Sequence, residues 1–221
     1  VQNVVIDGAG DGTIVNVADG SPAPASFSGK GTDTCGIIVY GGNITIQNMK
    51  IEAGSGAEGD TWARSAIGTV LSNAPMPEGY KLTVKNCTFV GQGETTACYG
   101  VLMSNDSFEI SGCSFDGFSS AIEMMGDGHV TKDCQIVNNT ITNCNYAIHG
   151  YYGKPEWGAS LDTTGVAHLV ITDNTICGDG NASNNTSAYT VVTLTDNFDS
   201  GALKIDMHGN TFSYAIVGGL A

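Results

Sequence analysis

The sequence predicts an all-β fold in which the chain winds as a solenoid, a single-stranded parallel β-helix of about seven coils with three strands in each. One pattern of apolar and turn residues recurs along the chain, and its apolar residues alternate with period two instead of the helical period. The 31 glycines and the low share of charged residues, 14%, suit a turn-rich β architecture. We expect residues 1–221 to form one such domain, as all-β chains of this length commonly do.

Each copy of the pattern is centred on a turn residue. Only Gly, Asn and Asp occur at this position, and these residues enter the left-handed backbone region at the lowest cost. The chain is therefore expected to bend sharply at each of them. The seven predicted turn residues are Asn3, Asn48, Asn86, Gly112, Asn138, Asp173 and Gly209.

Two short strands are expected to flank each bend, because apolar residues occupy alternate positions on both sides of it. The column two residues before the turn holds Val1, Ile46, Val84, Ile110, Ile136, Ile171 and Met207. The column four residues before it holds Ile44, Leu82, Phe108, Cys134, Leu169 and Ile205. The column three residues after it holds Ile6, Ile51, Phe89, Phe115, Ile141, Ile176 and Phe212.

A third strand in each coil is predicted from a further apolar column, usually preceded by Ala or Gly. Its members are Ile37, Ile67, Val101, Ile122, Ile148 and Val191. Three strands per repeat describe one coil of a solenoid, whose coils would stack about 4.8 Å apart like neighbouring strands of a sheet.

The position just after the turn is expected to be structural. It reads Val4, Met49, Cys87, Cys113, Asn139, Asn174 and Asn210. Stacked Asn amides can hydrogen-bond one another and the turn backbone, which would otherwise be buried without partners. Cys87 and Cys113 share this column and Cys134 lies in a neighbouring one, so we expect all three to be core thiols and not disulfide-bonded.

The segments "NCTF", "GCSF", "NNTI", "DNTI" and "GNTF" resemble the right-handed parallel β-helix repeat of the pectate-lyase-like superfamily. The resemblance covers Val1 to Phe212 and implies a right-handed winding. That superfamily includes lyases, hydrolases, epimerases, phage tailspikes and non-catalytic surface proteins, so it implies the fold more than the function. The chain is most similar to the non-catalytic, adhesin-type members.

The outward column of the third strand suggests a candidate site. It reads Ile38, Gly68, Leu102, Glu123, His149 and Val192, so Glu123 and His149 are expected side by side on adjacent coils. Asp127 and His129 follow in the next loop. Such residues can perform acid/base chemistry or hold a cation such as Ca2+. The alternative, a surface ion pair, is favoured over both.

The insertion "HGYYGKPEWGASLDTTGVAH" offers a candidate binding platform through Tyr151, Tyr152 and Trp157. Exposed aromatic rings beside Gly and Pro suit the apolar faces of sugars. The alternative is that these rings cap the edge of the coil and pack on Pro155.

Resemblance to the enzymes of the superfamily is incomplete. Its lyases use carboxylates for calcium and an Arg or Lys as the base, and its polygalacturonases use an Arg-x-Lys segment. Here Arg64 is the only Arg, and no Arg-x-Lys segment occurs. The leading hypothesis is a non-catalytic module that displays loops for adhesion or glycan binding. The alternatives are a polysaccharide lyase or glycoside hydrolase using Glu123, His149, Asp127 and His129, and a purely structural segment.

The net charge of −14 disfavours nucleic acid and anionic membrane surfaces as partners. The sequence contains no run of about 18 apolar residues, so we expect no membrane insertion. We expect an extracellular or cell-surface location, a glycan or host-surface ligand, and no cofactor, with Ca2+ the one ion considered. We also expect a segment of a longer protein, whose open coil ends associate end to end or continue into further domains.

Overall fold

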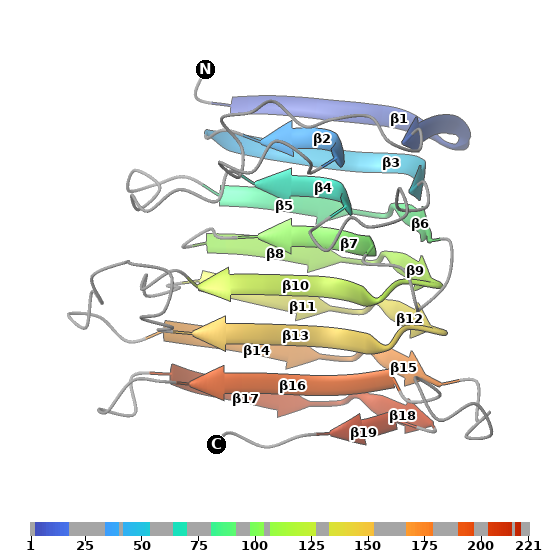
Figure 1. Ribbon diagram of the computed structural model, residues 1–221. Helices are drawn as coiled ribbons and strands as arrows, with labels where there is room; N and C mark the ends of the chain where they lie inside the picture. Colours follow the sequence, from blue (N-terminus) through green and yellow to red (C-terminus); the bar gives the residue numbers. More distant parts are fainter. Residues whose placement is uncertain are drawn as a thin grey trace.

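The computed structural model describes residues 3–17, 34–39, 42–53, 64–69, 81–91, 98–103, 107–126, 133–152, 167–178, 190–196, 203–213 and 215–217. Within these ranges every regular element is a β-strand, and neighbouring strands pair in parallel (Figure 1). The prediction of an all-β, parallel, solenoid-like chain is therefore confirmed.

The strands form three ladders. The first contains β1 (Asn3–Val17), β3 (Asn43–Ala53), β5 (Lys81–Lys85), β8 (Ser107–Ser111), β11 (Asp133–Val137), β14 (Ala167–Thr172) and β17 (Leu203–His208). The second continues from β1 and β3 into β6 (Thr88–Val90), β9 (Ser114–Asp116), β12 (Thr140–Thr142), β15 (Thr175–Cys177) and β18 (Thr211–Ser213). The third contains β2 (Thr34–Val39), β4 (Arg64–Thr69), β7 (Cys98–Met103), β10 (Ser120–Gly126), β13 (Tyr146–Tyr152), β16 (Thr190–Asp196) and β19 (Ala215–Val217).

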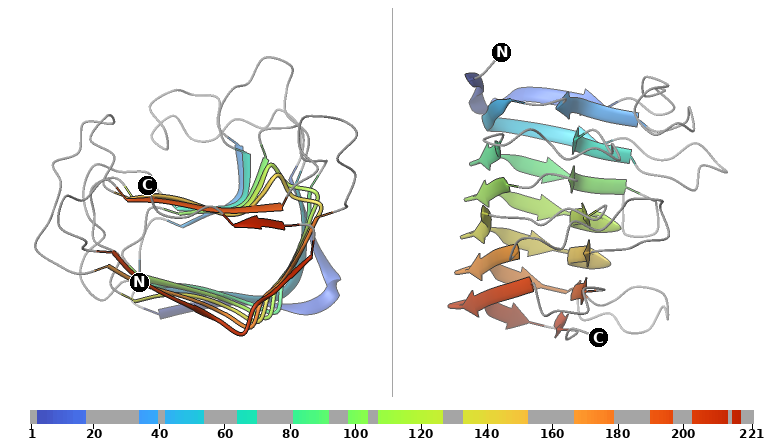
Figure 2. Two further views of the ribbon diagram at one scale, coloured as in Figure 1. Left: turned by 90° about the horizontal axis from the view of Figure 1, so that it is seen from below. Right: turned by 90° about the vertical axis from the view of Figure 1, so that its left-hand side faces the viewer.

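We call the strands that one repeat contributes to the three ladders a rung. The first two ladders form one strongly curled sheet, because β3 pairs with β5 before its bend and with β6 after it. Viewed along the stack, the strands of successive rungs nearly superimpose, and the third ladder faces the first across the core (Figure 2).

The predicted bends are confirmed at six of the seven positions. Positive φ angles of 50° to 69° occur at Asn48, Asn86, Gly112, Asn138, Asp173 and Gly209. A second row of left-handed residues lies where the second ladder ends, at Gly117 and Asn143. Each rung therefore turns at residues that tolerate this conformation.

The first predicted bend, at Asn3, is wrong. Asn3 pairs with Asn43 and Ile6 pairs with Ile46, so Ile6 belongs to the column before the bend and not to the column after it. The chain turns later, near Gly10, whose φ is 67°, and Val15 takes the position opposite Ile51. Two register shifts between Asp7 and Ile14 absorb extra residues, which a repeat aligned without gaps does not accommodate.

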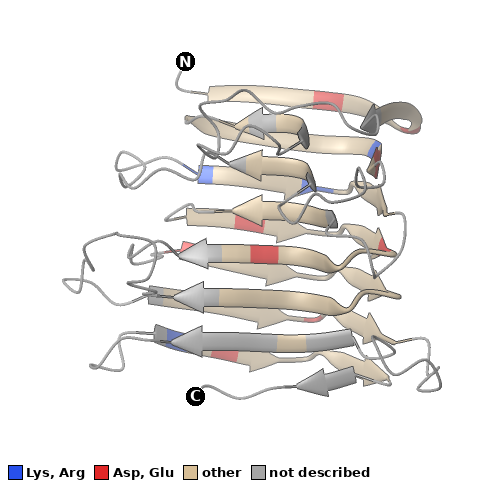
Figure 3. Cartoon of the chain, viewed as in Figure 1, with Lys and Arg blue, Asp and Glu red and all other residues tan. Residues whose placement is uncertain are grey.

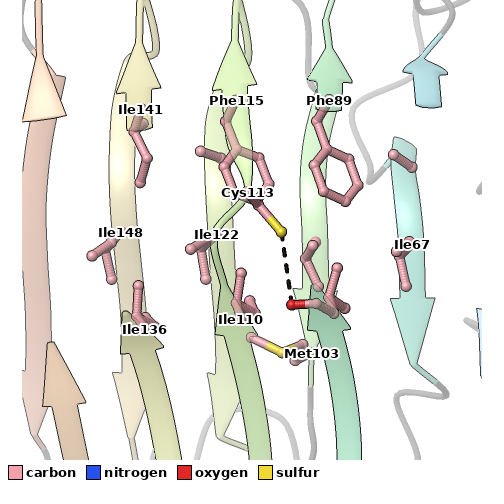
Figure 4. Close-up of a cluster of buried hydrophobic side chains, with 14 of the residues drawn as sticks. Ile67, Phe89, Met103, Ile110, Cys113, Phe115, Ile122, Ile136, Ile141 and Ile148 are labelled. Atoms are coloured by element: carbon pink, nitrogen blue, oxygen red, sulfur yellow. Dashed lines mark hydrogen bonds between the residues drawn. The ribbon is translucent and has the colours of Figure 1, made fainter. Parts of the chain in front are cut away.

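The inward columns form a continuous core (Figure 4). Ile46, Val84, Ile110, Ile136 and Ile171 are fully buried in one column, and in the column two residues earlier Leu82, Phe108, Cys134 and Leu169 are buried while Ile44 is partly buried. Phe89 and Phe115 stack on successive rungs with ring centroids 4.5 Å apart. Like side chains pile into ladders, as expected for rungs in register.

The third-strand column needs one correction at its last member. A register shift between Tyr146 and Ile148 aligns Ile148 with Val192, so Val192, which is buried, takes the place in this column that the sequence assigns to Val191. In the same register Thr193 is the backbone partner of His149, the position that the sequence assigns to Val192. The register that aligns the other members of this column, from Ile37 to Ile148, is as predicted.

Candidate functional site

Glu123 and His149 lie side by side on β10 and β13, as the sequence predicts. Their Cα atoms are direct partners in the parallel register, and His149 Nδ1 is 3.0 Å from Glu123 Oε2. The Ser120 hydroxyl donates a second hydrogen bond of 2.7 Å to the same oxygen. The Tyr146 ring stacks on the imidazole, with centroids 4.4 Å apart and an interplanar angle of 15°.

A local irregularity in both strands brings these four side chains to one face. Ala121 and Ile122 are consecutive and both belong to the core, and so do Ala147 and Ile148. The alternation is interrupted at these pairs, so residues three apart point to the same outer side. Ser120 therefore lies with Glu123, and Tyr146 with His149. Sequence analysis missed Ser120 and Tyr146, although the repeated Ala-Ile pair marks the irregularity.

The pair is buried and is not the surface ion pair favoured from the sequence. Glu123 is 4% exposed and His149 is 9% exposed, and Leu102, beside Glu123 in the outward column, is completely inaccessible. The outer face of the third ladder is thus covered at these rungs. Sequence periodicity identifies an outward column, but it carries no information on what covers that column.

The geometry defines what this cluster can do chemically. Glu123 Oε2 receives the Ser120 hydroxyl and contacts one imidazole nitrogen, so the carboxylate fixes the orientation of the His149 ring. The stacked Tyr146 ring limits its rotation further. A carboxylate-oriented imidazole can position a polar ligand group or exchange a proton with it.

The remaining predicted site residues belong either to the end of β13 or to segments outside the described residues. The backbones of Tyr151 and Tyr152 continue β13 and pair with Met125 and Gly126 of β10. Asp127, His129 and Trp157 lie outside the described residues. No group of three or more possible metal-ligating His, Cys, Asp or Glu side chains occurs within the described ranges.

The column after the bend is a hydrogen-bonded ladder, which agrees with the structural role predicted for Asn139. Asn139 Oδ1 accepts the backbone N–H of Cys113 at 2.9 Å, and Asn139 Nδ2 donates to the Ile110 carbonyl at 3.0 Å. Asn174 and Asn210 make the equivalent contacts on the next two rungs. Each amide therefore satisfies backbone groups of the preceding rung.

Cys87 and Cys113 extend this ladder with thiols in place of amides. Cys113 Sγ accepts the N–H of Cys87 at 3.5 Å and donates to the Val84 carbonyl at 3.7 Å. Figure 4 shows this sulfur directed at the carbonyl oxygen of the neighbouring rung. The hydrogen bond with Cys113 lowers the pKa of Cys87, and the same contact together with burial raises the pKa of Cys113. Cys87, Cys113 and Cys134 are all buried thiols, as predicted.

A charged cluster that sequence analysis did not identify lies on the outer face of the first ladder. Glu109 is 3.1 Å from both Lys81 Nζ and Lys85 Nζ. Partial burial acts to raise the pKa of Glu109, but the hydrogen bonds and charges of Lys85 and Lys81 outweigh it and lower the pKa. Elsewhere on the described strands, Lys50 and Glu52 form an ion pair at 2.6 Å and the other charged residues are scattered (Figure 3).

Among the residues that the structure describes, no helix is long and apolar enough to cross a membrane. No family model, curated protein or solved structure was found to match the chain.

Proposed function

We propose that the chain is a right-handed parallel β-helix of about seven coils, similar to the repeats of the pectate-lyase-like superfamily. The three parallel ladders support this proposal, as does the strong preference of parallel strand connections for right-handed crossovers. On this scaffold the function we propose is non-catalytic. The chain displays loops outside the cell or on its surface, for adhesion or glycan binding.

The observation that carries the binding proposal is the convergence on β10 and β13. These neighbouring strands hold Glu123 against His149, and β13 continues directly into Tyr151 and Tyr152. His149, the more exposed member of the pair at 9%, would offer a hydrogen bond to a sugar hydroxyl, and the aromatic residues that follow it in the sequence would offer apolar contact to a sugar face. The rigid ladder would keep both parts in register.

The test uses a glycan array followed by affinity measurement on any glycan that binds. Replacing Trp157 with Ala should weaken binding by about 1–3 kcal/mol, because a stacking ring supplies contact area. Thr83→Ala, on the outer face of the first ladder, is the matched control and should leave affinity unchanged. A chain that binds no glycan, or a Trp157→Ala variant that binds as well as the original, would remove this site from consideration.

A second candidate function, a polysaccharide lyase or glycoside hydrolase, is favoured by one observation. The hydrogen bond between the Glu123 carboxylate and the His149 imidazole resembles the pairing that orients a general base. Incubation with neutral and acidic polysaccharides, with detection of new reducing ends and of unsaturated products, distinguishes the two functions. Product formation that disappears in His149→Asn would establish the enzyme, whereas no product from any substrate would support the non-catalytic module.

A further inference from the structure

Two buried thiols are stacked on neighbouring rungs at the inner side of the bend. Asn86 N–H donates to the Ser111 carbonyl and Ser114 N–H donates to the Cys87 carbonyl, so Cys87 lies beside Cys113. The two residues are 1% and 2% exposed, respectively. Met49, also buried, adds a thioether to the same column, since Lys50 and Thr88 are partners in the register.

Cys134, another buried cysteine, lacks this arrangement within its own column. Cys134 is paired in register with Phe108 on one side and with Leu169 on the other. Cys87 and Cys113 therefore form the one in-register pair of cysteines among the described core columns. A pair of thiols on successive rungs differs chemically from an isolated buried thiol, because it offers two sulfur donors to one ion.

The rung spacing suits an ion bound between the two sulfurs. Neighbouring strands lie about 4.8 Å apart, which sets the repeat of equivalent atoms in a stacked column. Metal–thiolate bonds are about 2.3 Å long for a d10 ion such as Zn2+. If an ion lies midway between two stacked sulfurs, with its two bonds in line along the stack, the sulfurs are about twice that length apart. This separation is close to the spacing of neighbouring rungs.

We propose that Cys87 and Cys113 together bind one soft monovalent ion of the Cu(I) and Ag(I) class. Thiolate ligands select soft ions of this kind. On binding, two S–H bonds break and two sulfur–metal bonds form, and both protons pass to solvent without any change of oxidation state. The thiol hydrogen bonds to backbone carbonyls, such as that of Cys87 to Lys85, are given up in exchange.

The test uses Ag(I) alone as the probe, with the reduced full chain in nitrate buffer free of chloride. After prolonged incubation the chain is exposed to excess reduced glutathione, which removes silver held by a single thiol, and is then desalted. Silver per chain is counted by native mass spectrometry. We expect one ion to be retained per chain, because release requires breaking two protein–sulfur bonds.

The variants Cys87→Asn and Cys113→Asn are designed to keep the fold, because Asn occupies the equivalent position on later rungs and satisfies the same backbone groups. Each should lose the retained ion completely, and the double variant should lose no more. Cys87→Ser and Cys113→Ser carry the same test should an Asn variant fail to fold. Cys134→Ala is the control and should retain the ion. Retention unchanged in the Cys87 and Cys113 variants, or no retained ion in the original chain, would overturn the proposal.

Discussion

At the scale of single residues, the position after the bend shows that one backbone environment accepts different side chains. Four side chains in this column donate to a backbone carbonyl of the preceding rung, namely Cys87, Cys113, Asn139 and Asn174. The last three also accept a backbone N–H from that rung. A thiol is a weaker donor and acceptor than an amide. The sequence predicts the role of this column because polar residues recur there within an apolar pattern.

The amide of Asn139 should contribute directly to stability. Asn139→Ala would leave the Cys113 N–H and the Ile110 carbonyl buried without their partner, at a cost of roughly 1–3 kcal/mol in the free energy of unfolding. Chemical denaturation measures the difference. Thr140→Ala, at the exposed neighbouring position, should change stability by less than about 0.5 kcal/mol. Equal effects of the two substitutions would contradict a structural ladder.

The Glu109 cluster should make stability depend on pH. Because the folded-state pKa of Glu109 is below its ordinary value of 4.5, the stabilisation is present above that pH and is lost as pH falls through the lowered folded value. Glu109→Gln should therefore lower stability at neutral pH, by about 0.2–1 kcal/mol for such partly exposed pairs. The difference from the original chain should vanish in acid. A deficit that stays constant with pH would show that the carboxylate charge is not responsible.

The candidate site shows where residue-level prediction succeeds and where it ends. Period-two alternation predicts that Glu123 and His149 are neighbours, and they are. The same reasoning misses Ser120 and Tyr146, because the Ala-Ile irregularity places residues three apart on one face. Burial of the pair could not be predicted, since alternation shows which face of a strand a side chain lies on and not how accessible that face is.

At the scale of elements, the left-handed turn residues decide where each strand ends and the next begins. Their chemical restriction to Gly, Asn and Asp makes them readable in the sequence, and this is why six bends are predicted correctly. The first bend is misplaced because β1 accommodates extra residues through two register shifts. Irregularities of this kind leave the composition of a strand almost unchanged, so the sequence alone does not reveal them.

Gly112 offers a test of the turn requirement. Its φ is 64°, and an added Cβ would lie 2.6 Å from Asn86 Oδ1, so Gly112→Ala combines backbone strain with a steric conflict. We expect a loss of about 1–2 kcal/mol from the backbone alone, measured by thermal or chemical unfolding. Asn138→Gly at the equivalent bend is the control, because φ is already 55° there and Gly adopts that angle freely. A destabilisation by Asn138→Gly as large as that by Gly112→Ala would count against this account of the bends.

At the scale of the whole molecule, the core is closed along its length and exposed at the terminal rungs. Ile6 on β1 is 39% exposed and Phe212 on β18 is 38% exposed, whereas their counterparts on interior rungs are fully buried. Strands β1 and β18 also present backbone groups at the outer edges of their ladders. Such edges are templates for further strand pairing.

The exposed rungs predict concentration-dependent association of this chain, end to end. Light scattering over a concentration series should show the average mass rising. Phe212→Asp should weaken association about tenfold or more, because it places a charge on the apolar end. Thr211→Asp is the control, since Thr211 precedes Phe212 on the opposite face of β18 and should leave association unchanged. A chain that stays monomeric at every concentration would refute the prediction.

The hydrogen-bonded column after the bend has a consequence for how such a chain changes length. Cys87 N–H meets Cys113 Sγ, and Cys113 N–H meets Asn139 Oδ1, each across 26 residues. The hydrogen-bonding groups that these rungs present to one another in this column are therefore equivalent, whichever side chain fills it. Duplication of a 26-residue unit would insert a rung whose bonding groups find partners on both sides at once. Lengthening by whole units should thus preserve cooperative unfolding, whereas an insertion of another length within a strand would shift its register against the neighbouring rungs unless an irregularity absorbs it, as in β1.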